Sequence, residues 1–133
     1  MALEKKLNDF RNALDRLDES IEKSIIYKDQ EEYSFFRDSA IQRFEFTLEI
    51  AWKSIKSYLL VNEGVECRSP KSCMREFFSI GHIDQSEIST LLEMIDDRNL
   101  ATHTYHESLS EEIFLKIEEY SKLLEKIYKI ISA

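Results

Sequence analysis

The spacing of apolar residues near the start of the chain constrains its fold more than any other feature of the sequence. Apolar side chains recur there at alternating intervals of four and three residues, which places them along one face of an amphipathic helix. The residues of this face are Leu3, Leu7, Phe10, Leu14, Leu17 and Ile21. We therefore predict a helix that continues to about Ile26 and packs in a bundle.

A polar break at residues 27–30 separates this helix from a second, longer one. Apolar residues from Phe36 onwards carry the second helix to about Val61, and Gly64 suits its end. In residues 41–53 the apolar side chains lie on more than one side of the helix. Such a helix is either central in the bundle or part of a subunit interface.

Capping signals place two further helices. Ser69 at the cap and Pro70 at the first helical position begin a short helix that ends before Gly81. Asp84, followed three residues later by a glutamate, has the spacing of a capping box, although that box prefers Ser or Thr. From there a third long helix runs towards Asn99, which is a plausible terminator.

The last helix begins at Ser108 or Ser110 and continues to the C-terminus. The chain contains only two Gly and one Pro, whereas sheet proteins with tight hairpins usually need more of both. The predicted fold is therefore all-α, an up-and-down four-helix bundle with an additional short helix, in a single domain over residues 1–133.

The charge of the chain limits the partners that it can bind. The formal net charge is −8, and sequence-independent nucleic-acid binding needs clustered Lys and Arg. We expect no DNA partner, and any RNA site would be a small cleft, one that two subunits could assemble. No apolar run approaches the roughly 18 residues that a membrane span needs, so no membrane partner is expected.

Cys67 and Cys73 lie six residues apart and do not make the disulfide framework of a small secreted protein. The three histidines show no metal-binding spacing, and adjacent Asp96 and Asp97 would point about 100° apart on a helix. We predict a cytoplasmic protein with no cofactor and no metal.

Polar groups with chemical potential are concentrated in residues 98–105, whose sequence is RNLATHTY. Arg98 and His103 are five residues apart, so on an unbroken helix they would lie about 140° apart around the axis. They can address one small group only if the helix breaks after Arg98 or if they meet across a dimer. Thr102 and Thr104 weaken helix continuation, which makes a break reasonable.

An arginine and a histidine together provide two parts of a metal-free ribonuclease. The guanidinium can grip phosphate oxygens, the imidazole can exchange a proton near neutral pH, and the 2′-hydroxyl of RNA supplies the nucleophile. A polar helix end without catalytic function is the competing interpretation of the same residues.

Two residues of the second helix, Arg43 and Glu45, could reach the same cleft, where Glu45 would orient a motif side chain. An ordinary ion pair within the helix or between subunits is the alternative. Asp97 is a further supporting candidate, and His106 is a secondary one.

The segment RNLATHTY fits the Arg-x4-His-x-Tyr motif of HepT-like HEPN proteins, and residues 41–53, IQRFEFTLEIAWK, resemble the matching long helix of the nucleotidyltransferase substrate-binding family. The resemblance covers most of the chain, and helix order agrees with it. It implies a helical bundle that forms a homodimer or a higher oligomer. It also implies a minimal nucleotidyltransferase as partner, encoded by the adjacent gene.

The resemblance also assigns roles to residues of this chain. Arg98 would stabilise the phosphate, His103 would act as acid or base in RNA cleavage, and Asn99 would orient them. The partner would neutralise such a toxin by transferring AMP to Tyr105, the tyrosine of the motif, because a charged nucleotide beside the cleft blocks RNA.

Three functional hypotheses follow. The first is a toxin–antitoxin subunit, a metal-independent endoribonuclease neutralised by AMPylation. The second is a non-catalytic accessory subunit that binds a nucleotide or another substrate and presents it to the nucleotidyltransferase. The third, a purely structural dimeric bundle, leaves the polar cluster unexplained.

Overall fold

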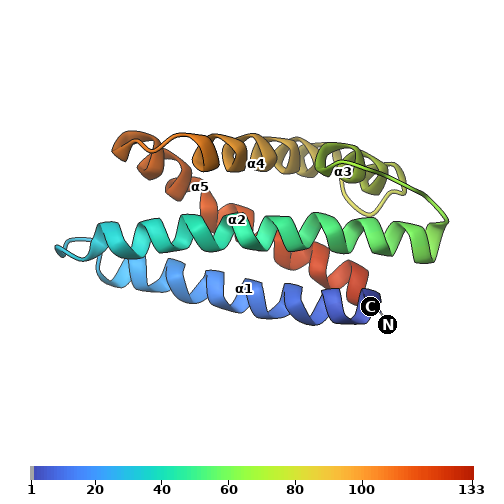
Figure 1. Ribbon diagram of the computed structural model, residues 1–133, viewed down its shortest axis with the longest axis horizontal. Coiled ribbons are helices and arrows are strands. Elements are labelled where there is room, and N and C mark those ends of the chain that lie inside the picture. Colours follow the sequence, from blue (N-terminus) through green and yellow to red (C-terminus); the bar gives the residue numbers. More distant parts are fainter. Residues whose placement is uncertain (1) are drawn as a thin grey trace.

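The computed structural model describes residues 2–133, and successive long helices run in opposite directions (Figure 1). This arrangement confirms the predicted all-α bundle of four long helices and one short helix. The elements are α1 (Ala2–Ile26), α2 (Tyr33–Tyr58), the π-helical turn η1 (Leu59–Glu63), α3 (Pro70–Ser79), α4 (Gln85–His103) and α5 (Glu107–Ser132).

Helix α2 is the central element, because it packs against α1, α3, α4 and α5. Phe44 is fully buried and stacks on Tyr120 of α5, with ring centroids 5.5 Å apart. On another side of α2, the Thr47 hydroxyl donates to the Ala13 carbonyl of α1 at 3.3 Å. These contacts explain why apolar residues of α2 do not follow a single stripe.

The predicted helix ends are confirmed at three places. Gly64 ends the π-helical turn in the left-handed conformation at φ 66°, where glycine meets no steric penalty. Ser69 and Ser72 form a reciprocal capping box at the start of α3. Asp84 and Glu87 do the same for α4.

Two boundaries near the motif were predicted wrongly. Helix α4 continues through Asn99 to His103, so Asn99 is not its terminator. Thr102 is accommodated because its hydroxyl, which has a single proton, lies within hydrogen-bond distance of two acceptors, the Arg98 carbonyl within the helix at 2.9 Å and Glu45 Oε1 of α2. Helix α5 begins at Glu107, so Ser108 is already helical, and Ser110 lies deeper in the same helix.

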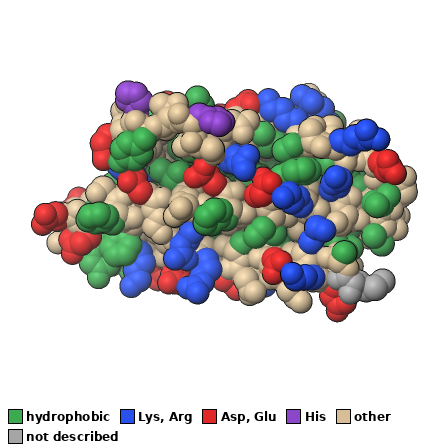
Figure 2. Space-filling model, viewed as in Figure 1, with side chains coloured by type: hydrophobic (Ala, Val, Ile, Leu, Met, Phe, Trp, Pro, Cys, Tyr) green, Lys and Arg blue, Asp and Glu red, His purple; other side chains and the backbone are tan. Residues whose placement is uncertain are grey.

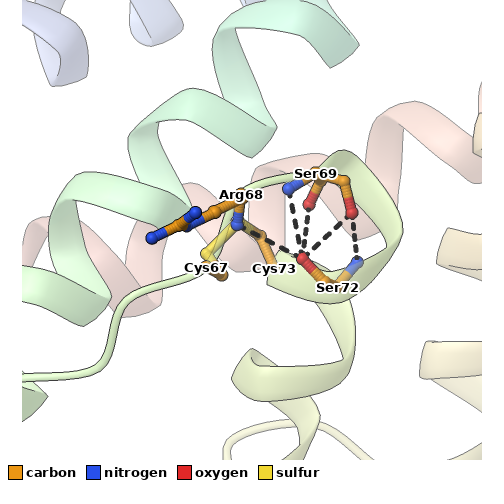
Figure 3. Close-up of a disulfide and its surroundings, with 5 residues drawn as sticks. All are labelled: Cys67, Arg68, Ser69, Ser72 and Cys73. Carbon is orange, nitrogen blue, oxygen red and sulfur yellow. Dashed lines mark hydrogen bonds between the residues drawn. A yellow bond between two sulfur atoms is a disulfide. The ribbon is translucent and has the colours of Figure 1, made fainter.

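The structure pairs Cys67 with Cys73 in a disulfide, which the sequence interpretation had not included (Figure 3). The capping box at Ser69 turns the chain into α3 and brings the two Cα atoms to 5.2 Å, a normal separation for this bond. The pairing does not support the predicted reducing compartment, so cytoplasmic localisation stays a prediction. Within residues 2–133, no helix is both long and apolar enough to cross a membrane.

Candidate functional site

The motif residues lie at one end of the bundle, where α4 gives way to α5. Residues 98–103 form the last turns of α4, and Thr104 ends the helix with an extended backbone at φ −143°. The helix is therefore unbroken between Arg98 and His103, so the predicted break falls only after His103. The two side chains leave the helix axis about 140° apart within one chain.

Arg98 is held against the central helix. Its side chain is 31% exposed, and Nη2 donates to Oε2 of Glu49 on α2 at 3.0 Å. Its Nε is buried and has no hydrogen-bond partner among the described residues. The guanidinium thus keeps donors beyond the one that Glu49 uses.

The Glu49 carboxylate accepts from three hydrogen-bond donors at the surface. Besides Arg98, its carboxylate accepts from Trp52 Nε1 at 3.1 Å and from Lys53 Nζ at 3.1 Å. Burial by itself raises the pKa of the Glu49 carboxyl, but these three donors outweigh it and hold the pKa below its ordinary value. Glu49 is therefore a stable anion that fixes the position of Arg98.

Tyr105 lies in the short link between α4 and α5, and its side chain is 67% exposed. Its hydroxyl contacts two carboxylates, Asp38 at 3.2 Å and Glu107 at 3.4 Å. The negative charge of Asp38, followed by partial desolvation and Glu107, raises the pKa of the tyrosine. The phenol stays protonated near neutral pH and points toward a ready proton acceptor.

A buried cation anchors this corner of the molecule. Arg37 on α2 is 4% exposed and pairs with Asp38 at 3.1 Å, with Glu107 at 2.7 Å and with Glu111 at 3.4 Å. Because Glu107 and Glu111 belong to α5, this cluster ties the start of α5 to α2. The position of Tyr105 follows from that tie.

A cavity of about 440 Å³ opens beside Tyr105, between α2 and the junction of α4 with α5. Asp38, Glu45 and Tyr105 supply its polar groups, and Phe35 and Leu109 contribute apolar surface. Neither Arg98 nor His103 lines it. We call this space the tyrosine cavity.

The supporting candidates from the sequence separate in space. Glu45 does contact the motif, because it accepts a hydrogen bond from Thr102. Arg43 turns to α1 instead, where its Nη1 lies 3.4 Å from the Arg16 carbonyl. Asp97 was predicted wrongly as a cleft residue, because it is 7% exposed and faces α5.

Asn99, His103 and His106 are all exposed, and His106 occupies the N-cap of α5 without a side-chain capping bond. Over residues 2–133, the structure groups no three His, Cys, Asp or Glu side chains in a way that could hold a metal ion.

On the face drawn in Figure 2, acidic side chains gather toward the end that carries the motif. Lys and Arg side chains are more numerous toward the opposite end, and others lie along the lower edge of the half that carries the motif.

Sequence reasoning missed Asp38 and Glu49, which hold Tyr105 and Arg98 respectively. The first contact spans 67 residues of sequence and the second spans 49, and nothing in local spacing marks such contacts. The available signal was indirect, since both carboxylates lie on the helix whose apolar pattern marked it as central or interfacial.

The sequence model of the family described as "Nucleotidyltransferase substrate binding protein like" matches residues 5–133, almost the whole chain. The chain belongs to this family. The resemblance drawn from RNLATHTY and residues 41–53 is thereby confirmed at the level of the family. Membership of the nucleotidyltransferase substrate-binding family indicates a role in association with a nucleotidyltransferase.

A solved structure also resembles this member of the nucleotidyltransferase substrate-binding family. A protein from Thermus thermophilus, known from a crystal structure, is 34% identical in sequence, with a TM-score of 0.74. The match covers 88% of this chain and 99% of the Thermus chain. No curated protein matches.

Proposed function

We propose that this family member is the HEPN subunit of a two-component nucleotidyltransferase system of the toxin–antitoxin type. Its activity is metal-independent cleavage of RNA by Arg98 and His103. The observation that carries the proposal is the state of Arg98. This arginine is fixed by Glu49 at the surface and is 31% exposed, and Glu49 uses Nη2 only, which leaves Nη1 available for a phosphate.

The chemistry needs no cofactor. The 2′-oxygen of the RNA attacks the adjacent phosphorus, and the bond from phosphorus to the 5′-oxygen breaks. The products are a 2′,3′-cyclic phosphate and a 5′-hydroxyl. Arg98 stabilises the charge that builds on the phosphate oxygens, and His103 exchanges a proton with the attacking or leaving oxygen. Asn99, exposed one residue after Arg98, orients the phosphate.

The site is completed by a second copy of the chain. Because α4 is unbroken, Arg98 and His103 of one copy point in different directions and do not share a cavity. In a two-fold dimer, Arg98 of one copy faces His103 of the other, and the symmetry gives two equivalent sites. An exposed apolar side chain on α4, Leu100 at 49% exposure, supports a contact there.

Tyr105 is the point of control by the partner nucleotidyltransferase. Its Oη attacks the α-phosphorus of ATP bound to the partner, a new O–P bond forms and pyrophosphate leaves. The phenolic proton passes to Asp38, which already lies 3.2 Å from Oη. The AMP then occupies the tyrosine cavity and its mouth, and its phosphate repels RNA.

A second candidate function is the non-catalytic accessory subunit. The observation that favours it is the acidic surrounding of the motif, where Asp38, Glu45 and Glu107 all lie near Tyr105 or Thr102. Such a surface opposes an RNA backbone. In that case the protein would bind and present a substrate to the nucleotidyltransferase without cleaving it.

Cleavage of a labelled RNA pool in EDTA tests the proposal. Wild type, Arg98→Ala and His103→Ala are compared after unfolding curves show that all three are equally folded. Each substitution is expected to reduce cleavage by about 100-fold or more, the usual scale for a lost acid–base group. Absence of cleavage by wild type whose mass shows no bound AMP would favour the accessory subunit.

A further inference from the structure

A second recess lies on the same face as the motif, in the groove between α1 and α2. It encloses about 740 Å³, within the usual range for small-ligand sites. Its α1 side carries Asp9, Asn12 and Arg16, and its α2 side carries Arg43, Phe46 and Glu49, among others. None of these residues has a part in the chemistry proposed above, except that Glu49 holds Arg98. We call this recess the α1–α2 groove.

The aromatic side chain in the groove has no structural explanation. Phe46 is 58% exposed, although Phe44, two residues earlier on the same helix, is fully buried. Phe46 lines the groove together with residues of α1 and α2, so more than half of its side-chain surface is available to a ligand there. Exposed aromatic rings beside cationic groups are the usual platform for nucleobases.

Two arginines flank one end of the groove. Arg16 is 68% exposed, and its nearest carboxylate, Glu19, is 3.9 Å away, too far for a hydrogen bond. Arg43 contacts the Arg16 carbonyl through Nη1 alone. Both guanidinium groups keep donors for an anion, and Arg side chains bind phosphate through paired hydrogen bonds.

The two ends of the groove differ in charge. Antiparallel packing places Ala13 beside Thr47, so Arg16 and Arg43 lie at one end and Asp9 lies towards the other. Asp9 is seven residues, or about 10 Å, along α1 from Arg16. A carboxylate is an acceptor for ribose hydroxyls. In a bound nucleotide, the phosphate would therefore meet Arg16 and Arg43, the base would meet Phe46, and the sugar would meet Asp9.

The groove adjoins the proposed cleavage site through Glu49, which lines the groove and also accepts from Arg98 at 3.0 Å. We propose that the α1–α2 groove binds one nucleoside phosphate unit, with its base on Phe46 and its phosphate on Arg16 and Arg43. The unit is either a residue of single-stranded RNA or a free nucleotide.

Binding measurements separate these two sources. Fluorescence anisotropy follows a short labelled single-stranded RNA and, in a separate titration, labelled AMP; unlabelled AMP is then added to the RNA complex as competitor. The His103→Ala background prevents cleavage, so binding is measured independently of catalysis. Displacement of RNA by AMP indicates that the groove accepts a free nucleotide; RNA binding without displacement indicates an RNA subsite.

Phe46→Ala is expected to weaken binding about fivefold or more, the lower end for loss of a base–aromatic stack. Phe46→Leu, which keeps apolar bulk, is expected to weaken it similarly. The matched control is Leu60→Ala, because Leu60 is another exposed apolar residue but lines neither the groove nor the tyrosine cavity. Arg43→Gln should reduce the salt dependence of RNA binding by about 0.7 in slope, the value for one phosphate contact.

Three results would overturn the inference. These are no binding of either probe to the His103→Ala protein, equal binding by the Phe46 variants, or a change of oligomeric state in sedimentation when Phe46 is replaced. The last result would assign Phe46 to a contact between copies. The inference and the proposed function can fail separately, because wild type that binds RNA through Phe46 but does not cleave it refutes only the nuclease.

Discussion

Adjacent aspartates near the motif have opposite environments. Asp97 is 7% exposed and accepts from the Tyr120 hydroxyl at 2.6 Å and from Lys116 Nζ at 2.7 Å. Burial, and then the bond to Asp97, raises the pKa of Tyr120 well above its ordinary value. Asp96 instead makes a surface pair with Lys71 at 2.7 Å. Asp97 therefore supports the fold rather than the cleft.

Replacement of Asp97 tests this distinction. Asp97→Ala leaves the buried Tyr120 hydroxyl and the Lys116 ammonium without their acceptor, and should lower the free energy of unfolding by about 2 kcal/mol. The neighbouring variant Asp96→Ala removes only a surface ion pair and should change it by about 0.5 kcal/mol or less. Urea unfolding followed by circular dichroism measures both. Equal effects of the two substitutions would contradict the assignment.

At the scale of single residues, the sequence indicated which side chains belong to the motif but not which residues they contact. RNLATHTY singled out Arg98 and Tyr105 as candidate site residues, and the structure places them 31% and 67% exposed respectively, while their roles stay predictions. The orientation of Asp97 depends on which face of α4 meets α5, and local spacing near a helix end does not determine that. The contact between Arg98 and Glu49 joins helices far apart in sequence, so no local pattern reveals it.

At the scale of helices, prediction succeeded where a local signal sets the boundary. Ser69, Gly64 and Asp84 each act through their own backbone or capping hydrogen bonds, and each predicted end was confirmed. Asn99 failed as a terminator because the turn after it still finds helical hydrogen bonds, including that of Thr104 N–H to the Leu100 carbonyl at 3.0 Å. The end of α4 depends on the anchoring of α5 by Arg37, which is a tertiary effect.

The capping box of α3 gives a direct test at this scale. Ser69→Ala removes the side-chain acceptor for the Ser72 N–H and should destabilise the protein by about 1 kcal/mol. Ser69→Asp keeps an acceptor at the cap and is the matched variant that should retain stability. Thermal unfolding of the three proteins measures the difference. A loss as large in Ser69→Asp as in Ser69→Ala would show that capping is not the cause.

The first and last helices are joined by a two-pronged ion pair, with Arg11 Nη1 and Nη2 lying 2.6 and 2.8 Å from the Glu125 carboxylate oxygens. The hydrogen bond from Arg11 is the largest cause that lowers the pKa of Glu125 in the folded state. A lowered folded pKa means that the pair contributes its full stability above the unfolded pKa, about 4.3 for Glu. That contribution is lost as pH falls through the lower folded value.

Glu125→Gln should therefore lower the free energy of unfolding at pH 7 by about 1 kcal/mol. The urea midpoint falls accordingly. The difference from wild type should shrink in acid and vanish below the folded pKa of Glu125. Urea titrations over a series of pH values measure this trend. Glu119→Gln, an exposed position on the same helix, is the control, and it should show no such convergence. A wild-type advantage that persists in strong acid would contradict the ion-pair account.

For the molecule as a whole, the uneven distribution of charge is the main constraint on function. The net charge is −8, yet on the face that carries the motif the basic side chains are more numerous toward the end away from Tyr105 and along the lower edge. An RNA strand that reaches Arg98 is expected to follow the basic side chains of this face, away from the acidic groups around Tyr105. The sequence supplied the net charge, but this distribution appears only when the helices are packed.

Growth measurements test the system at this scale. Expression of the chain alone should arrest growth, and either His103→Ala or co-expression of the proposed partner nucleotidyltransferase should relieve the arrest. With Tyr105→Phe, which keeps the ring but removes the acceptor oxygen, the partner should no longer give relief by AMP transfer. Relief of that variant by a catalytically intact partner would contradict control through Tyr105.

The central claim is that one RNA-cleaving site takes Arg98 from one copy and His103 from another. The direct measurement is RNA cleavage in EDTA by a purified heterodimer of Arg98→Ala and His103→Ala chains, isolated through two different affinity tags. Each homodimer should be inactive, whereas the heterodimer keeps one complete site and should cleave at about half the wild-type rate. An inactive heterodimer of two folded chains beside an active wild type would contradict the shared site.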